Sequence, residues 1–259
     1  MSRILLSLCS LLLCVSACKV MQPGKLNTYR EKSVSLESKI KQNGDNKVSA
    51  FSYDYPEFSD PHIQQFVMQR IVLDSGMQSV DEMAHEFIAE YDRYARESTH
   101  VNPWHEERNL EVRLQTPAYI GFALEWNNYT GGAHGMYSTV FYNYDVQDQN
   151  ELFIHELIEP TRRANLTRLG EEIFRHQEGL SDTASLEEGY FFENGQFYLN
   201  DNYTFTPEGI LFLYNIYEIK PYVAGQTELL IPYRAVLPLM NKKGRSLVQE
   251  IQNKHSDTP

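Results

Sequence analysis

A glycine-rich segment with a single histidine carries the clearest chemical signal inside this chain. It reads Tyr129-Thr130-Gly131-Gly132-Ala133-His134-Gly135. Glycine tolerates positive φ and close backbone approach, so the segment predicts a tight turn that presents His134 between aromatic strands. Such a turn can offer backbone N–H groups and an imidazole to a ligand. It can equally be a structural hairpin in which His134 bonds to neighbouring backbone, because one histidine without partners defines no mechanism.

A second segment, rich in tyrosine and proline, lies nearer the C-terminus. It includes Tyr217-Glu218-Ile219, Pro221-Tyr222 and Ile231-Pro232-Tyr233. Aromatic side chains at loop tips can stack on sugars or anchor in a protein cleft, and binding loops commonly sit on a rigid sheet. The two segments together predict a ligand site, whose candidate residues are Tyr129, Gly131, Gly132, His134, Pro221 and Tyr222.

Motifs of known enzymes and metal sites are largely missing from the sequence. There is no G-x-S-x-G elbow, no S-x-x-K, no phosphate-binding P-loop and no G-x-G-x-x-G. The run from His155 to Glu159 resembles a zinc-protease helix, but Glu159 stands where the second histidine should be and Pro160 follows directly. We therefore expect no metal site, no cofactor and no catalytic residue.

The elements that must position these segments can be read from the hydrophobic periodicity and the turn residues. Their order predicts an α+β fold with antiparallel sheets, helices packed on one face and two apposed lobes. The expected elements are strands at 34–40 and 48–55 joined by a turn at Asn43-Gly44, helices at 61–73 and 79–97, strands at 109–116, 119–127 and 136–146, a helix at 161–177, a tight hairpin at 190–199, strands at 210–219 and 229–231, and a last helix at 234–252 with a kink or late start at Pro238.

The N-terminus predicts where the protein acts. Arg3 precedes a continuous, mostly apolar run from Ile4 to Val15, and small residues lead into Cys18. This order is typical of a bacterial lipoprotein signal, in which the Cys18 thiol receives the lipid. A plain cleaved signal peptide is the alternative. We expect a signal peptide over residues 1–17, a lipidated tether over 18–28, and an extracytoplasmic protein held by its lipid on the periplasmic face or the cell surface.

Composition narrows the classes of partner. The chain has 259 residues and a formal net charge of −12. Nucleic acids require clustered Lys and Arg, so we expect no nucleic-acid partner. Opposite charges speed encounter, so the acidity favours a cationic partner, although it can also serve solubility alone. All three cysteines lie at or before residue 18, which excludes disulfides and a cysteine nucleophile from the folded part.

The glycine-histidine turn and the tyrosine-proline series resemble, in combination, the extracytoplasmic domain of lysozyme-sensing anti-sigma factors of the RsiV type. They also resemble the non-catalytic N-terminal module of PdaC-type peptidoglycan deacetylases. The resemblance extends over about residues 31–239. It implies an α+β fold of two lobes and a binding role at the cell envelope. The chain differs from the anti-sigma type in starting with a lipoprotein signal, so the resemblance does not extend to sigma-factor regulation.

These observations favour a lipid-anchored, non-catalytic binding protein that recognises a lysozyme-like protein or a cell-wall glycan such as peptidoglycan. We expect an N-terminal lobe over residues 29–128 and a C-terminal lobe over 129–255. Two alternatives remain open at this point. One is a cell-wall hydrolase or other envelope enzyme that uses His134 with a carboxylate. The other is a structural module that only packs against envelope proteins.

Overall fold

The computed structural model describes residues 24–41, 48–72, 75–98 and 101–256. The expected signal peptide, Cys18 and the Asn43-Gly44 turn lie outside these residues. The strands are β1 (Tyr29–Glu37), β2 (Ala50–Phe58), β3 (His105–Gln115), β4 (Tyr119–Tyr129), β5 (Met136–Asp145), β6 (Asn150–Glu151), β7 (Tyr203–Phe205), β8 (Gly209–Tyr214) and β9 (Thr227–Pro232). The α-helices are α1 (Pro61–Ile71), α2 (Val80–Glu97), α3 (Arg163–Gln177), α4 (Tyr233–Val236) and α5 (Lys242–Ser256). The 3₁₀ turns are η1 (Ile154–Glu156), η2 (Pro160–Arg162), η3 (Glu193–Gly195), η4 (Tyr222–Ala224) and η5 (Leu237–Leu239).

Two sheets carry the fold, which is α+β as predicted. A six-stranded sheet has the order β1-β2-β3-β4-β5-β6, and a three-stranded sheet has the order β7-β8-β9. Every pair is antiparallel except β2–β3, which is parallel. The exception arises because α1 and α2 connect β2 to β3, and such a crossover returns the chain in the same direction. The expected lobe boundary at residues 128 and 129 falls inside the β4–β5 pair, and the large sheet continues to Glu151.

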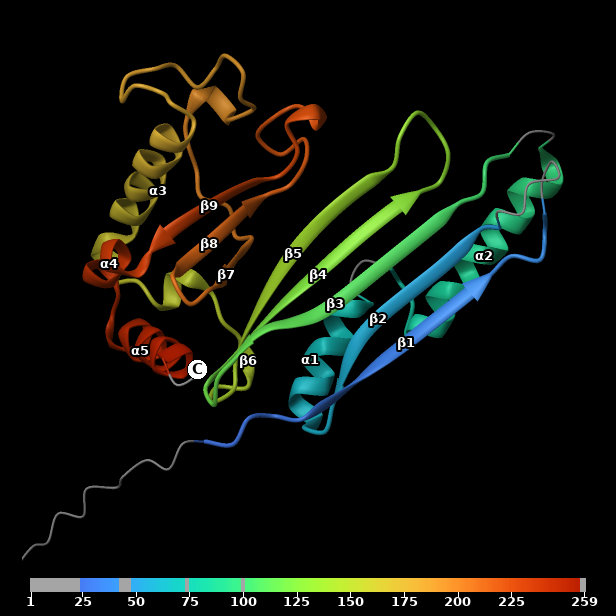
Figure 1. Cartoon of the computed structure of the whole chain (residues 1–259), viewed down its shortest axis with the longest axis horizontal. Coiled ribbons are helices and arrows are strands. Elements are labelled where there is room, and N and C mark those ends of the chain that lie inside the picture. The colour runs from blue at the N-terminus through green and yellow to red at the C-terminus, as the bar shows by residue number, and fades with distance from the viewer. Residues whose placement is uncertain (1–23, 42–47, 73–74, 99–100, 257–259) are drawn as a thin grey trace, which may run out of the picture.

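Helices α1 and α2 cover one face of the large sheet (Figure 1). Asp60 caps α1 by accepting from the backbone N–H groups of His62 and Ile63, and Ser79 caps α2 by accepting from Glu82 N–H at 3.1 Å. Apolar side chains at helical spacing then meet alternate residues of the strands. The core between them includes Tyr53, Val67, Met83, Leu110 and Phe122.

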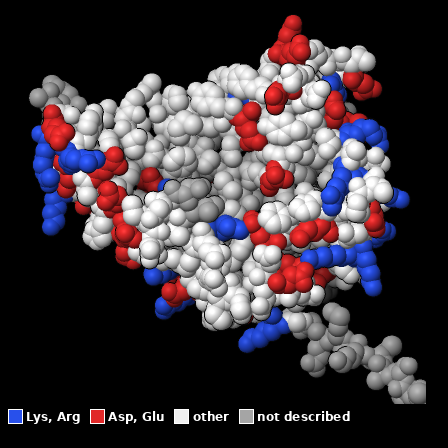
Figure 2. All heavy atoms as spheres, turned by 180° about the vertical axis from the view of Figure 1, so that it is seen from behind, with Lys and Arg blue, Asp and Glu red and all other residues white. Residues whose placement is uncertain are grey.

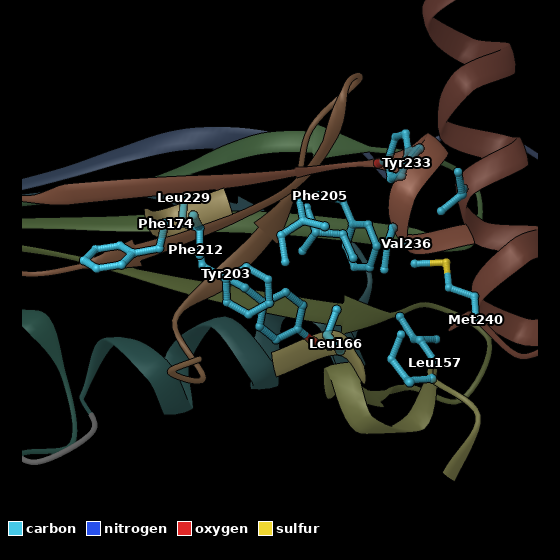
Figure 3. Close-up of a cluster of buried hydrophobic side chains, with 14 of the residues drawn as sticks. Leu157, Leu166, Phe174, Tyr203, Phe205, Phe212, Leu229, Tyr233, Val236 and Met240 are labelled. Carbon is cyan, nitrogen blue, oxygen red and sulfur yellow. The ribbon is translucent and has the colours of Figure 1, made fainter. Parts of the chain in front are cut away.

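The C-terminal core lies between β7–β9 and the helices α3, α4 and α5 (Figure 3). It includes Phe174, Tyr203, Phe205, Phe212, Leu229, Val236 and Met240. The expected last helix is interrupted as its proline indicated. Because proline lacks an N–H and clashes with the preceding turn, the chain forms α4, then η5 around Pro238, and restarts as α5 at Lys242.

Two expected elements are wrong. The hairpin at 190–199 does not form, although Asn194 and Gly195 take the positive φ of a tight turn, at 53° and 64°. Phe192 and Phe197 on either side of the turn pack their rings on Phe174 instead of extending into paired strands. The strand expected to run from 210 to 219 ends at Tyr214, and the residues after it turn into the loop before β9.

Asparagine side chains join the small sheet to the free edge of β5. Asn202 accepts a hydrogen bond from Phe141 N–H at 2.8 Å and donates to Thr139 C=O at 2.8 Å. Asn215 accepts from Thr139 N–H at 2.8 Å and donates to the same carbonyl at 3.0 Å. These amides take the place of a neighbouring strand, so the edge of β5 is closed and the two lobes are held together.

Candidate functional site

The glycine-rich segment forms the exposed turn between β4 and β5, as expected. Gly131 and Gly132 have φ of +105° and +100°, which side chains with a Cβ rarely adopt. The Tyr129 hydroxyl donates to Gly132 C=O at 3.1 Å and so ties the turn to the end of β4. His134 is exposed at the end of this turn.

The structure brings His134 against Tyr222 from the loop between β8 and β9. Their ring centroids are 4.3 Å apart with an interplanar angle of 32°. Both side chains also bind one carbonyl, since the distance from His134 Nδ1 to Gly135 O is 2.9 Å and Tyr222 Oη donates to the same oxygen at 3.3 Å. The two segments that the sequence singled out therefore meet at one end of the molecule, at the top of Figure 1.

Two more tyrosines extend this contact into what we call the aromatic cluster, formed by His134, Tyr137, Tyr217 and Tyr222. The ring of Tyr222 lies 6.2 Å from that of Tyr137 and 5.6 Å from that of Tyr217. Tyr217 is 48% exposed and takes a positive φ of 65°, which is uncommon for a residue other than glycine. The adjoining Val223 is 93% exposed. The cluster thus presents apolar surface to solvent from a loop on a rigid sheet.

The other candidate residues are placed differently. Tyr129 stacks on His105, with centroids 5.7 Å apart, and its hydroxyl accepts from Asn102 Nδ2 at 3.2 Å. Tyr129 therefore contacts β3, and its ring is not part of the aromatic cluster, whose contacts lie next to β5. Pro221 is exposed and begins the η4 turn that carries Tyr222.

A groove that the sequence analysis missed lies beside Tyr137, on the face of the large sheet opposite α1 and α2. We call it the polar groove; its volume is about 510 Å³. Its lining residues are Glu107, Asn109, Glu125, Trp126, Asn127, Tyr137, Ser138, Thr139 and Gln226. Strand register aligns six of them in two rows across β3, β4 and β5. Asn127 on β4 pairs with Glu107 and Tyr137 on its two neighbours, and Glu125 pairs with Asn109 and Thr139. The signal for this groove was the polar residue at every second position of three successive strands, opposite the apolar positions.

The polar groove is acidic, because its lining includes two glutamates and neither Lys nor Arg. Glu107 and Glu125 are exposed, and among the described residues no ion pair includes either of them. Asp54 on the neighbouring strand β2 extends the acidic surface, since its register partner is Asn109. On the face drawn in Figure 2, Lys and Arg lie among Asp and Glu along the lower part of the molecule.

His155 lies in the short 3₁₀ turn η1, and Glu159 directly precedes η2. His155 is exposed and stacks on Phe153 at 5.6 Å, and Pro160 begins the next turn. Within the ranges that the structure describes, no group of three His, Cys, Asp or Glu residues is arranged to hold a metal ion. None of the helices in those ranges combines the length and apolar character of a membrane crossing.

Two known families match successive parts of the chain. Residues 42–137 match the family described as Deacetylase PdaC, and residues 151–234 match the family described as Protein of unknown function (DUF3298). We call these two matched stretches the PdaC segment and the DUF3298 segment. The PdaC segment includes the β4–β5 turn and Tyr137, and the DUF3298 segment includes Pro221, Tyr222 and Gln226. Both the aromatic cluster and the polar groove therefore use residues of the two segments together. A match to the PdaC family suggests an extracytoplasmic protein of the cell envelope.

Solved structures share the fold over most of the chain. A DUF3298 family member from Bacteroides fragilis has 20% identity and a TM-score of 0.67, and the match covers 88% of this chain and 98% of that one. A DUF3298 family protein from Pseudomonas aeruginosa has 21% identity and a TM-score of 0.63, with 83% and 95% covered. At such identities the likeness shows the fold alone. No curated protein matches the sequence.

Proposed function

We propose that this chain is a lipid-anchored, non-catalytic binding protein of the cell envelope. It is attached to a membrane through Cys18, faces away from the cytoplasm, and recognises a lysozyme-like protein or a cell-wall glycan through the aromatic cluster. The single observation that carries this proposal is the ring contact between His134 and Tyr222, which joins the two loops most suited to binding.

The surroundings of His134 support binding over catalysis. A histidine that acts as general base needs hydrogen-bond reach to a reacting group, and its second nitrogen is usually oriented by a carboxylate. Here the imidazole contacts a backbone carbonyl and the Tyr222 ring. Aromatic rings held in place at loop tips supply contact area at low entropy cost, which is how many recognition surfaces work.

The charge of the chain supports a cationic protein as one class of ligand. A net charge of −12 attracts a basic protein such as lysozyme and speeds encounter with it. A glycan would instead be held by ring stacking and hydrogen bonds, with little dependence on salt. The salt dependence of binding therefore separates the two ligand classes.

A pull-down with a matched control tests the proposal. The mature chain carrying Cys18→Ser, which cannot be lipidated, is incubated with lysozyme or purified peptidoglycan at about 50 and about 300 mM salt. We expect saturable binding to one of the two. The variant His134→Ala/Tyr222→Ala should weaken it at least about tenfold, as loss of an anchoring aromatic usually does.

The control is Phe153→Ala/His155→Ala, which removes another exposed histidine stacked on an aromatic ring, at 5.6 Å. It should bind like the unmodified chain. Absence of binding to both targets, or equal losses in the two double variants, would contradict the proposal and favour a purely structural module. Membrane attachment is tested separately, by metabolic labelling with a radioactive fatty acid, which Cys18→Ser should abolish.

A further inference from the structure

The polar groove has a lining that the proposed function does not use. From it we propose that the groove binds a saccharide that bears free amino groups, a short run of hexosamine units that are not N-acylated. This inference rests on the proposed envelope-binding role and names the chemistry of one ligand class. The volume of the polar groove, about 510 Å³, falls within the range of roughly 300–1,000 Å³ typical of small-ligand sites.

The uncharged part of the lining suits a polyhydroxylated ligand. Asn109, Asn127 and Gln226 supply amide donors and acceptors, and Thr139 supplies a hydroxyl. Tyr137 forms the aromatic wall, is 36% exposed, and is steadied by its edge contact with Tyr222. Sugar hydroxyls both donate and accept, and the apolar face of a pyranose ring can lie on an aromatic ring.

The charged part of the lining selects for amines. Register places Glu107 diagonally across from Glu125 on the same face, which puts their Cα atoms roughly 7–8 Å apart. Like charges on neighbouring strands of one face repel each other, and in the described part of the chain neither carboxylate forms an ion pair. An ammonium group bound between or beside them would remove the repulsion and form charge-assisted hydrogen bonds. An acylated amine is uncharged, so it would neither relieve the repulsion nor form charge-assisted hydrogen bonds.

The same lining disfavours a protein partner at this position. The centres of protein–protein interfaces are depleted in Asp and Glu and enriched in aromatic residues, Met and Arg. The polar groove is lined by two glutamates and by seven uncharged residues, of which only Trp126 and Tyr137 are aromatic. A small polar ligand fits such a surface better than a protein loop does.

Calorimetric titration of the mature Cys18→Ser chain tests the inference with three probes. These are a tetramer of β-1,4-linked glucosamine, the same tetramer fully N-acetylated, and tetralysine. We expect the glucosamine tetramer to bind about tenfold more tightly than the acetylated one, with a preference that shrinks as salt is raised. Tetralysine, which has the charge without the sugar, should bind more weakly than the glucosamine tetramer.

The variant Glu107→Gln/Glu125→Gln should bind the two tetramers about equally. The control Glu187→Gln/Glu188→Gln removes the same charge from an exposed site elsewhere and should keep the preference. Circular dichroism of each variant verifies that it is folded. Equal binding of the two tetramers to the unmodified chain, or tetralysine binding as tightly as the glucosamine tetramer, would overturn the inference. So would a preference that survives in Glu107→Gln/Glu125→Gln.

These results are separable from those of the pull-down. If lysozyme or peptidoglycan binding depends on His134 and Tyr222 while the glucosamine tetramer does not bind, the groove inference fails and the proposed function stands. If the tetramer binds as expected while neither lysozyme nor peptidoglycan does, the groove inference stands and the proposed function fails as stated.

Discussion

Replacing Asn202 by alanine should loosen the joint between the two lobes. Its side-chain amide makes three hydrogen bonds, one from Phe141 N–H and two to the carbonyls of Thr139 and Leu213. The two carbonyls keep other partners in Asn202→Ala, because Asn215 still donates to Thr139 C=O and Asn200 still donates to Leu213 C=O. The loss is therefore concentrated on one group, the N–H of Phe141.

The loss in free energy of unfolding is estimated from the one hydrogen-bond donor left without a partner. Phe141 is buried, so its N–H cannot readily form a replacement hydrogen bond with water when Asn202 is truncated. A buried donor left without a partner costs about 1–3 kcal/mol. We expect Asn202→Ala to lower the free energy of unfolding by about 2 kcal/mol, which for a chain of this size lowers Tm by roughly 4–8 °C.

Urea denaturation followed by tryptophan fluorescence measures the loss, with Asn127→Ala as the control. Asn127 is an exposed asparagine on β4, and its truncation should change stability by no more than about 0.5 kcal/mol. Hydrogen exchange should also show faster exchange at the Phe141 amide. A value for Asn202→Ala within about 0.5 kcal/mol of the unmodified chain, with Phe141 still protected, would refute the reasoning.

Three further predictions concern single contacts. Tyr119→Phe removes the buried hydroxyl that donates to Asn143 at 2.6 Å and should cost about 1–2 kcal/mol in urea denaturation. Gly225→Ala places a Cβ at φ +71° and ψ −162°, a conformation essentially restricted to glycine, beside the aromatic cluster, and should cost about 1–3 kcal/mol by the same assay. The Lys243 ammonium hydrogen-bonds Asp148 and holds the pKa of that carboxyl below its ordinary value. The pair's contribution is therefore complete above the ordinary aspartate pKa and is lost as pH falls through the lowered one. Lys243→Met should then make stability fall less steeply as pH drops below about 4.

The local elements were largely predictable from the sequence. Apolar spacing located α1 and α2, and Pro238 indicated the break before α5. The errors arose where tertiary packing overrode a local signal. Asn194 and Gly195 form the turn that their types favour, but the rings of Phe192 and Phe197 gain more by burial against Phe174 than by strand pairing.

The candidate site was predictable only in part. His134 and Tyr222 were chosen separately, from turn and loop composition, and nothing in the sequence stated that their rings would meet. The polar groove escaped notice because it depends on register. Glu107 and Glu125 are eighteen positions apart in sequence, and they become neighbours only when β3 pairs with β4. The alternation of polar and apolar residues within each strand indicated which side chains share a face of the sheet, but it did not indicate how the strands are aligned with one another.

A hydrogen-exchange footprint of the ligand-bound protein tests the central claim most directly. The chain is saturated with whichever of lysozyme or soluble peptidoglycan fragments binds in the pull-down, and exchange is followed by mass spectrometry. The account predicts slower exchange in residues 130–137 and 215–226, the two segments that form the aromatic cluster and its loops. Protection confined to other surfaces, such as α1 and α2, with these two segments unchanged, would contradict it.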